Sequence, residues 1–298
     1  MSLRRVLVGL IGANIMKSLS PALHTDAFAA AAIEGYYHLM DVNLGSRRLP
    51  QLFDTAKTVG FAGTNVTFPF KQDVLALLDD LDPEAAQIGA VNTVTFAADG
   101  RATGYNTDRR GFRLNFEEGL GRARAEAATV VLIGTGGAGH AVAFALMDLG
   151  VASLVLHDRD ADRSAGLAGE IAGHYGASRC RVAGDLAAEV AAADGVVNAT
   201  PIGMHGFPGN PVPVEALHAG QWAADIIYTP IETAFIQAAA AKGLRVLTGG
   251  GMCVHQAAEA FRLFTGVAPD TARMHRTFAK ALAARDAAVA EPSMAQQS

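Results

Sequence analysis

The sequence predicts an α/β protein of two domains, one of them built on a doubly wound parallel sheet. Three observations lead to this prediction. Residues 129–160 form one strand–turn–helix–strand unit, TVVLIGTGGAGHAVAFALMDLGVASLVLHDRD. Short apolar runs alternate with helical segments from there to residue 247, which is the pattern of a parallel sheet. With 298 residues, the chain is long enough for two ordinary domains whose cores need no disulfides.

The first strand of this unit, Val130–Ile133, leads directly into three glycines in G-x-G-x-x-G spacing, Gly134, Gly136 and Gly139. Such glycines permit a tight turn, close approach of the backbone to a diphosphate, and close packing of a helix on a strand. The helix expected over residues 140–149 directs its unpaired N–H groups and the positive end of its dipole toward this turn. The pattern predicts a dinucleotide site, with a tight packing turn as the alternative.

An acidic residue supports the dinucleotide interpretation. The next strand, Ser153–Leu156, leads to Asp158, roughly 20 residues beyond the last glycine, where a carboxylate meets an adenosine ribose. A lone glycine motif is a weak signal, but strand, glycines, helix, strand and acid in this order are specific. We therefore predict a Rossmann-type dinucleotide domain.

The rest of this domain and the C-terminal part follow in order. We predict further helices over residues 164–174, 186–193 and 233–242, and strands over 179–182, 195–199, 223–228 and 245–247. The triple glycine Gly249–Gly251 is predicted to be a hinge or a tight passage. Two last helices are expected over residues 252–264 and 271–284.

The N-terminal part also alternates strands and helices. We predict strands over residues 6–11, 36–42, 64–68 and 88–95, and helices that begin at Ser20, cover 49–58 and run from Lys71 to Leu78. Residues 104–108 are predicted as a loop, and 111–128 as a helix that links the two domains.

Two serines stand where the first strand gives way to the first helix. The hydroxyl of Ser20 is expected to cap the helix, with Pro21 at the first helical position. Turn and cap chemistry is thus one interpretation of Ser18 and Ser20. The other is ligand binding, because both residues follow the carboxyl end of a strand, where α/β sheets bind ligands.

Lys71 is expected at the start of a helix, where a positive charge meets the positive end of the dipole. Either the lysine reaches back over the strand end to a partner, or it points into solvent as an ordinary surface residue. Sequence alone favours the surface interpretation.

Several polar residues of the N-terminal part lie at strand ends or in short loops, namely Asn65, Thr67, Asn92, Asn106 and Asp108. Each one alone is more often a turn former, because Asn and Asp bond to their own backbone. Together, and with Lys71 nearby in sequence, they suggest a pocket for a polyhydroxylated small molecule.

Composition excludes several classes of function. The net charge is −5, which does not suggest nucleic acid as a partner. The N-terminus lacks the long apolar segment and cleavage site of a signal peptide, and no membrane span is expected. Cys180 and Cys253 lie far apart, and none of the nine histidines occurs in a metal-ligand pattern. We expect a reduced cytoplasmic protein without a bound metal.

The motifs SLSPALH, GTNVTFPFK, GAVNT, GYNTD, GTGGAG, NATPIGM, DIIYTPIET and GMCVHQAAEAF together resemble the shikimate dehydrogenase family over nearly the whole chain. The resemblance implies a substrate-binding catalytic domain, residues 1–112, to which the C-terminal helices 252–285 return. A dinucleotide-binding domain would cover residues 113–251. The resemblance also implies reversible oxidation of the C3 hydroxyl of shikimate, or of quinate, with a nicotinamide cofactor. This reaction would belong to aromatic amino acid biosynthesis or to quinate catabolism.

The resemblance also implies roles for individual residues. Lys71 and Asp108 would be the catalytic pair. The substrate would bind to Ser18, Ser20, Asn65, Thr67, Asn92, Tyr228 and Gln256. The cofactor would bind to Gly134, Gly136, Gly137, Ala138, Gly139, Asp158, Arg163, Thr200, Met204 and Gly251.

The sequence departs from the biosynthetic members of the family at the cofactor. Those members usually have Asn-Arg-Thr followed by another arginine, which binds a 2′-phosphate, whereas this chain has Asp158-Arg159-Asp160 and then Arg163. Two carboxylates repel a phosphate, and Asp158 can accept hydrogen bonds from both ribose hydroxyls. NAD is therefore favoured. NADP stays an alternative because Arg159 takes the place of the family's NADP-binding arginine.

Other functions stay open. The chain could be a biosynthetic NADP enzyme, an aminoshikimate or aminoquinate dehydrogenase, or a ligand sensor that keeps the fold without turnover. Both residues of the Lys71–Asp108 pair are present, which favours an enzyme. Ser18 and Ser20 favour shikimate over quinate, because quinate users in the family often have threonine at the second position. The expected partner is a small-molecule substrate, and the oligomeric state is expected to be monomer or homodimer.

Overall fold

The computed structural model describes residues 5–45 and 47–290. The chain divides into two compact units, residues 1–107 with 256–298, and residues 108–255. Both divisions fall inside helices, at Thr107/Asp108 in α4 and at His255/Gln256 in α9. The two units are described separately, and both have the α/β architecture that the sequence predicts.

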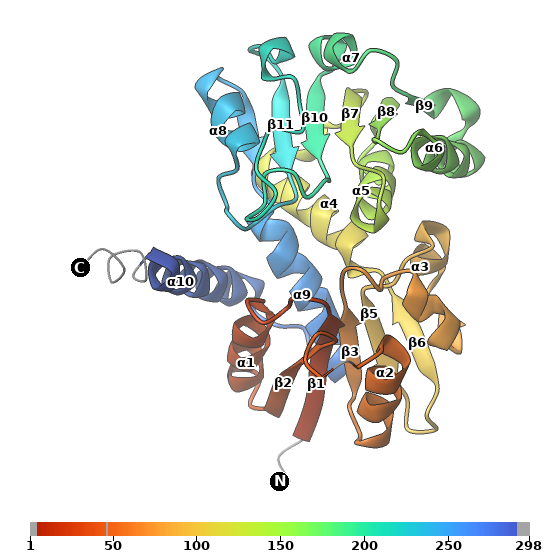
Figure 1. Ribbon diagram of the computed structural model, residues 1–298, viewed down its shortest axis with the longest axis vertical. Coiled ribbons are helices and arrows are strands. Elements are labelled where there is room, and N and C mark those ends of the chain that lie inside the picture. Colours follow the sequence, from red (N-terminus) through yellow and green to blue (C-terminus); the bar gives the residue numbers. More distant parts are fainter. Residues whose placement is uncertain (1–4, 46, 291–298) are drawn as a thin grey trace. The chain divides into compact units, whose positions relative to one another are not determined.

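The first unit contains a six-stranded mixed sheet in the order β2-β1-β3-β5-β6-β4 (Figure 1). Strands β1, β2 and β3 are parallel, and β5 runs antiparallel to β3 and β6. The strands are β1 (Arg5–Gly12), β2 (Glu34–Asp41), β3 (Gly63–Val66), β4 (Asp80–Leu81), β5 (Thr93–Phe96) and β6 (Ala102–Tyr105). The helices are α1 (Ser20–Ala30), α2 (Leu49–Thr58), the 3₁₀ helix η1 (Asp73–Leu77) and α3 (Pro83–Ile88).

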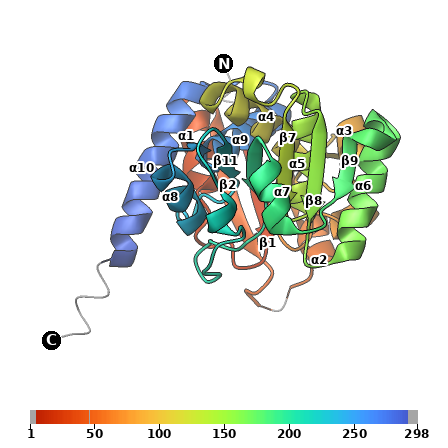
Figure 2. The same ribbon diagram turned by 90° about the horizontal axis from the view of Figure 1, so that it is seen from above.

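The C-terminal helix α10 (Thr271–Ala290) belongs to the first unit and packs beside α1 in both views (Figure 1, Figure 2). The guanidinium of Arg273 binds both carboxylate oxygens of Asp26 at 2.8 Å, and the Thr277 hydroxyl donates to the same carboxylate. The C-terminal chain thus returns to the N-terminal unit, as predicted.

The second unit contains six parallel strands in the order β12-β11-β10-β7-β8-β9. Counted along the chain this is the order 3-2-1-4-5-6 of the Rossmann fold, with the reversal between β7 and β10. The strands are β7 (Thr129–Ile133), β8 (Ser153–His157), β9 (Cys180–Val182), β10 (Gly195–Asn198), β11 (Trp222–Asp225) and β12 (Arg245–Leu247). β7, β10 and β11 are almost wholly buried, as their apolar sequences require.

Helices precede, separate and follow the strands of this sheet along the chain. They are α4 (Thr107–Gly119), α5 (Gly137–Asp148), α6 (Ala161–Tyr175), α7 (Leu186–Ala192), α8 (Ala234–Ala241) and α9 (Gly250–Thr265). Three short 3₁₀ helices are η2 (Arg122–Arg124), η3 (Ala177–Arg179) and η4 (Val214–Ala216). Within the described residues, no helix is long and apolar enough to cross a membrane.

Three local predictions in the N-terminal unit are wrong. The segment from Lys71 to Leu78 forms a turn and the 3₁₀ helix η1 rather than an α-helix. Ile88 ends α3, and the strand predicted over 88–95 begins only at Thr93. The predicted loop 104–108 instead contains the end of β6 and the first turn of α4.

Candidate active site

In the second unit, the turn between β7 and α5 has space on one side only. Gly134 has φ +98°, and a Cβ there would lie 2.8 Å from the Ala199 backbone. A Cβ at Gly139 would lie 2.0 Å from the carbonyl oxygen of Gly134. At Gly136, by contrast, no heavy atom lies within 4 Å of an added Cβ. Packing therefore requires two of the glycines, and the third borders open space.

The N-terminus of α5 has no side-chain cap. The next three α-helices in sequence are capped by side-chain oxygens, those of Asp160, Asp185 and Thr233. Gly137 and Ala138 form the first turn of α5, so their N–H groups belong to this uncapped end. Open space at a glycine beside uncapped N–H groups fits a diphosphate held by backbone donors.

Asp158 follows β8 and is held by the glycine turn. Its Oδ2 accepts hydrogen bonds from the N–H (2.7 Å) and the hydroxyl (3.1 Å) of Thr135, and its Oδ1 accepts one from the N–H of Asp160. Burial by itself would raise the pKa of Asp158, but these hydrogen bonds and the charge of Arg163 outweigh burial and lower it. The carboxylate is therefore ionised at neutral pH and oriented beside the turn.

The second acid of this segment, Asp160, has a structural role. Its carboxylate caps α6 by accepting from the N–H groups of Asp162 and Arg163. The same carboxylate lies 3.2 Å from Nε of Arg163. Arg163 is thus paired with an acid of its own helix, although the pair is exposed and weak.

A second polar group lies where β10 and β11 end. Asn198 donates to the carboxylate of Asp225 at 3.1 Å and accepts from the N–H and the hydroxyl of Thr200. Asp225 also accepts from the N–H of Ile227 and from the hydroxyl of Thr233. Burial raises the pKa of Asp225 to about 6, against the lowering effect of these three hydrogen bonds. Sequence reasoning missed Asp225, although an acid that ends an apolar strand is a recognisable signal.

Three further predicted site residues of this unit are Met204 and Gly251, assigned to the cofactor, and Tyr228, assigned to the substrate. Met204 is exposed in the segment after β10, and Tyr228 is half-buried after β11. Gly251, in the first turn of α9, packs so closely on α4 that a Cβ would lie 1.9 Å from Oδ1 of Asn115. The tight passage predicted at the triple glycine is therefore present, and packing alone explains a glycine at position 251.

In the first unit, the predicted substrate residues gather at one edge of the sheet. β1, β3 and β6 all run in one direction and β5 in the other. The carboxyl ends of the first three strands and the amino end of β5 therefore share an edge. The predicted residues at or just beyond that edge are Ser18 and Ser20 after β1, Asn65, Thr67 and Lys71 at and after β3, and Asn92 before β5.

A buried network of hydrogen bonds fixes this edge. Nδ2 of Asn65 donates to the hydroxyl of Thr93 at 2.9 Å, and this hydroxyl donates to Oδ1 of Asn92 at 3.0 Å. Oδ1 of Asn92 also accepts from the N–H of Thr107 at 2.9 Å, while its Nδ2 donates to the Thr107 hydroxyl. Asn92 thus holds the residue at which α4 begins, directly before Asp108. Thr93 and Thr107 lie within the quoted motifs GAVNT and GYNTD, but sequence reasoning did not single them out.

A stacked pair of aromatic rings contacts this network at Asn65. The hydroxyl of Tyr37 donates to Oδ1 of Asn65 at 2.8 Å, and the Tyr37 ring stacks on His24 with centroids 4.5 Å apart. Burial lowers the pKa of His24 to about 3, so its ring is neutral at physiological pH. A neutral ring packs here as an apolar group, and it restricts the positions open to Tyr37.

The serine pair follows β1 as predicted, with one correction. The residue that caps α1 is Leu19, without a side-chain hydrogen bond, so Ser20 does not cap the helix through its hydroxyl. Instead the hydroxyl of Ser18 accepts from the N–H of Ser20, and the two hydroxyls are 3.2 Å apart. The reason is that Ser20, and not Pro21 as predicted, takes the first helical position, which places Ser20 inside the first turn. Both side chains are half-buried.

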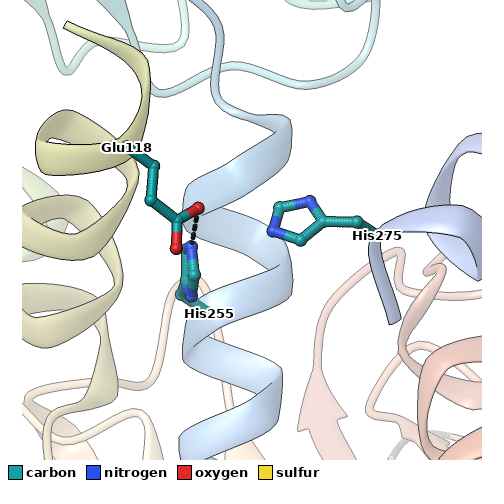
Figure 3. A group of neighbouring side chains, drawn as sticks. All are labelled: Glu118, His255 and His275. Atoms are coloured by element: carbon teal, nitrogen blue, oxygen red, sulfur yellow. Dashed lines mark hydrogen bonds and ion pairs between the residues drawn. The ribbon is translucent and has the colours of Figure 1, made fainter. Parts of the chain in front are cut away.

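Of the remaining predicted residues, Lys71 belongs to the first unit, while Asp108 and Gln256 stand at the two points where the chain passes from one unit to the other. Lys71 is half-buried in the turn before η1, and its carbonyl accepts from the N–H of Val91 at 2.8 Å. Asp108 is buried in the first turn of α4, where the helix dipole stabilises a negative charge. Gln256 is half-buried in α9, directly after His255, whose Nε2 is 2.9 Å from a carboxylate oxygen of Glu118 (Figure 3).

Taken together, a Rossmann-type sheet with an open glycine turn and a second α/β unit with a polar sheet edge define the class of dinucleotide-dependent oxidoreductases. Comparison with known proteins identifies the particular family. Residues 10–94 match the shikimate dehydrogenase substrate binding domain, and residues 249–277 match the shikimate 5′-dehydrogenase C-terminal domain. The chain belongs to the shikimate dehydrogenase family.

Relatives of similar identity are named for different cofactors. The chain is 46% identical to a shikimate dehydrogenase (NADP⁺) of Streptomyces avermitilis, over 90% of this chain and 93% of the relative. It is 44% identical to a quinate/shikimate dehydrogenase (NAD⁺) of Corynebacterium efficiens, over 92% of this chain and 97% of the relative. A solved quinate dehydrogenase of Corynebacterium glutamicum in complex with NAD superposes with a TM-score of 0.87 and 42% identity, covering 93% of this chain and 99% of that one.

Proposed function

We propose that this chain catalyses the reversible oxidation of the C3 hydroxyl of shikimate to the ketone, with NAD as the favoured cofactor and NADP as the alternative. Quinate is the second candidate substrate. Family membership supports the reaction type, since the relatives compared above are named as dehydrogenases of shikimate or quinate. An aminoshikimate or aminoquinate substrate would use the same chemistry.

We propose a division of labour between the two parts of the chain. Residues 1–112 with 252–285 bind the substrate, and residues 113–251 bind the dinucleotide. The bounds differ by a few residues from the two units, which change at Thr107/Asp108 and His255/Gln256. The match of residues 10–94 to a substrate binding domain supports the first assignment, and the glycine turn supports the second.

One observation carries the substrate part of the proposal. Four segments distant in sequence bring polar side chains to a single sheet edge, where Asn65 and Asn92 are fixed by buried hydrogen bonds. A ligand with a carboxylate and several hydroxyls needs such fixed donors and acceptors. In the proposed complex its polar groups are bound by Ser18, Ser20, Asn65, Thr67, Asn92, Tyr228 and Gln256.

The proton of the C3 hydroxyl is assigned to Lys71 and Asp108. In oxidation Lys71 takes this proton while C3 loses a hydride, and in reduction it returns one. Asp108 holds the ammonium group through a charge-assisted hydrogen bond and so orients it. The bound nicotinamide supplies the acceptor or donor of the hydride.

The cofactor preference follows from Asp158. An ionised carboxylate beside the glycine turn accepts hydrogen bonds from ribose hydroxyls and repels a 2′-phosphate. The pairing of Arg163 with Asp160 reduces the positive charge available to such a phosphate. The backbone donors at Gly136, Gly137 and Ala138 bind the diphosphate, while Thr200 and Met204, after β10, and Gly251, in the first turn of α9, are assigned to the nicotinamide end.

The test is a steady-state assay of the purified protein with shikimate and quinate, each with NAD and NADP. We expect NAD reduction with shikimate, a higher kcat/KM with NAD than with NADP, and a higher kcat/KM for shikimate than for quinate. Binding of shikimate by calorimetry without turnover in any combination would indicate a ligand sensor. Equal or better use of NADP would contradict the cofactor assignment, and activity with quinate alone would contradict the substrate preference.

A further inference from the structure

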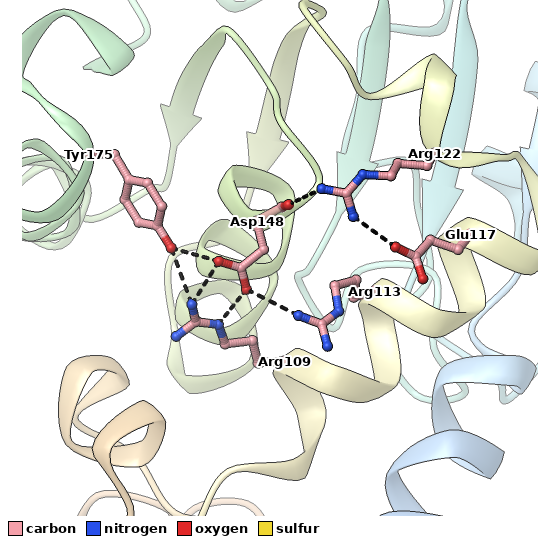
Figure 4. A network of polar contacts seen from close by, with 6 residues as sticks. All are labelled: Arg109, Arg113, Glu117, Arg122, Asp148 and Tyr175. Carbon is pink, nitrogen blue, oxygen red and sulfur yellow. Dashed lines mark hydrogen bonds and ion pairs between the residues drawn. The ribbon is translucent and has the colours of Figure 1, made fainter.

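We propose that Arg109, together with Asp148 and Tyr175, is a positioning group for Asp108. The inference rests on the proposed function, because it matters only if Asp108 takes part in the reaction. The three side chains form a closed cluster inside the second unit, and Arg109 directly follows Asp108 in the first turn of α4 (Figure 4).

The cluster is held by charge-assisted hydrogen bonds of short length. Nε and Nη2 of Arg109 donate to the two carboxylate oxygens of Asp148 at 2.7 and 2.8 Å. The hydroxyl of Tyr175 donates to the same carboxylate at 2.8 Å and accepts from Nη2 of Arg109 at 3.1 Å. The guanidinium also lies over the ring of Phe144, 5.2 Å from its centroid. A bidentate pair closed by a third group fixes the guanidinium in direction as well as in distance.

The charges of Arg109 and Asp148 each lie at the end of a helix whose dipole disfavours them. Arg109 is in the first turn of α4, at the positive end of the dipole, and Asp148 ends α5, at the negative end. Only 8% of the Arg109 side chain and 17% of the Asp148 side chain are exposed. Buried ion pairs are seldom more stabilising than apolar side chains of the same size. The pair is therefore better explained by its effect on the position of the first turn of α4 than by a contribution to the free energy of unfolding.

The turn that carries Asp108 is held on both sides. The N–H of Thr107, the residue before Asp108, donates to Oδ1 of Asn92, and Arg109, the residue after it, binds Asp148. With both neighbours fixed, the backbone of Asp108 has little freedom. A displacement of about 1 Å at a reacting group can reduce a rate by about 100-fold.

Farther along α4, two contacts provide matched controls. Arg113, one turn later, approaches Asp148 only at 3.9 Å, and Glu118 at the end of the helix binds His255. Neither contact is made by a residue of the first turn, although the weaker Arg113 contact reaches the carboxylate that Arg109 binds. If α4 only had to be attached, Arg113→Met or Glu118→Gln would affect kcat as much as a change at Arg109.

The test is a double-mutant cycle between positions 109 and 108, with shikimate and NAD. Arg109→Met is expected to lower kcat about 10- to 100-fold in the wild-type background, with little change in the KM for NAD. In the Asp108→Asn background the same substitution should leave kcat nearly unchanged. Tyr175→Phe, which removes one hydroxyl, tests the cluster if Arg109→Met does not fold, and it should lower kcat by a smaller factor. Arg109→Lys should restore kcat only in part, because lysine cannot form the bidentate pair.

An equal loss in both backgrounds, or an equal loss in Arg113→Met, would overturn the inference and assign Arg109 a structural role. So would unchanged kcat in a folded Arg109→Met protein. A wild-type protein without dehydrogenase activity, or with full activity after Asp108→Asn, would instead refute the proposed function. The two failures are therefore distinguishable.

Discussion

The carboxyl edges of the two sheets are built in different ways. At the β7–β8 edge, the contacts around the proposed diphosphate position come from the backbone, through the Gly134 turn and the uncapped N-terminus of α5. At the edge shared by β1, β3 and β6, the contacts around the proposed substrate position come from side chains, with Asn65 and Asn92 at the centre. A backbone site is damaged by added atoms, whereas a side-chain site is damaged by removed ones. Four predictions test this contrast, from the largest expected effect to the smallest.

Adding one methyl group at Gly139 should separate packing from binding at the backbone site. In Gly139→Ala the new Cβ would lie 2.0 Å from the carbonyl of Gly134, so the turn must move, at a cost of about 3 kcal/mol in the free energy of unfolding. In Gly136→Ala no atom lies within 4 Å, so stability should hardly change while the KM for NAD rises. Urea unfolding and cofactor titration of both variants measure these effects. Equal stability of the two would show that the turn is not tightly packed.

The side-chain network at the ends of β10 and β11 should make stability depend on pH. Burial raises the pKa of Asp225 to about 6 in the folded protein, above its value of 3.8 in an unfolded chain. Protonation of Asp225 therefore adds fully to the free energy of unfolding below pH 3.8, and this contribution is lost as the pH rises through 6. Asp225→Asn keeps the shape without the charge. Its stability relative to wild type should rise by about 3 kcal/mol between pH 4 and pH 7.

Urea unfolding of both proteins across that pH range checks this prediction. The exposed cap variant Asp185→Asn serves as a control for loss of a carboxylate in the same unit. A constant difference between Asp225→Asn and wild type at every pH would contradict the burial of an ionisable Asp225.

Removing the side chain of Asn92 should disrupt the edge shared by β1, β3 and β6. In Asn92→Ala the N–H of Thr107 and the hydroxyl of Thr93 lose their buried acceptor, at a cost of about 2 kcal/mol. Because Asn92 is also a proposed ligand, the KM for shikimate should rise as well. The matched control is Asn43→Ala, which loses one exposed hydrogen bond to Asn14. Thermal unfolding and steady-state kinetics of both variants give the comparison, and equal Tm values would argue against the network.

The smallest effect is expected for the one side chain assigned to the ribose. Asp158→Asn removes the charge beside the glycine turn, and the preference for NAD over NADP in kcat/KM should fall about tenfold, or about 1.4 kcal/mol. Asp162→Asn, which neutralises an exposed acid of the same segment, should leave the ratio unchanged. A ratio that moves equally in both variants would indicate a general effect of charge.

The same contrast explains how much could be predicted from the sequence. The second unit depends on local patterns, so its glycine turn and strand β12 were predicted with correct types and nearly correct bounds. Helix α2 of the first unit was predicted in the same way. Backbone sites leave a signature in consecutive residues. The position of Asp158 directly after β8 was predicted in this way, but its bonds to Thr135 could not be, because they depend on the conformation of the turn.

The edge shared by β1, β3 and β6 was harder to predict because it depends on pairing between distant segments. Tyr105 is in a strand because it pairs with Thr93, which a local pattern cannot show. The apolar run from Ile88 hid the helix α3, although Asp82 caps it and Pro83 begins it, both recognisable signals. The residues of the network, Tyr37, Thr93 and Thr107, are ordinary in sequence and become important only through their contacts.

The proposed role of Lys71 is tested most directly by kcat for shikimate oxidation in Lys71→Met across a range of pH. We predict a loss of about 10²–10⁴-fold, the usual effect of removing a positioned general acid–base, with little change in NAD binding. Lys280→Met, which changes an exposed lysine of α10, should behave as wild type. A near-normal kcat in Lys71→Met at every pH would contradict the account, because Lys71 would then be only a ligand or a surface residue and another group would carry the proton.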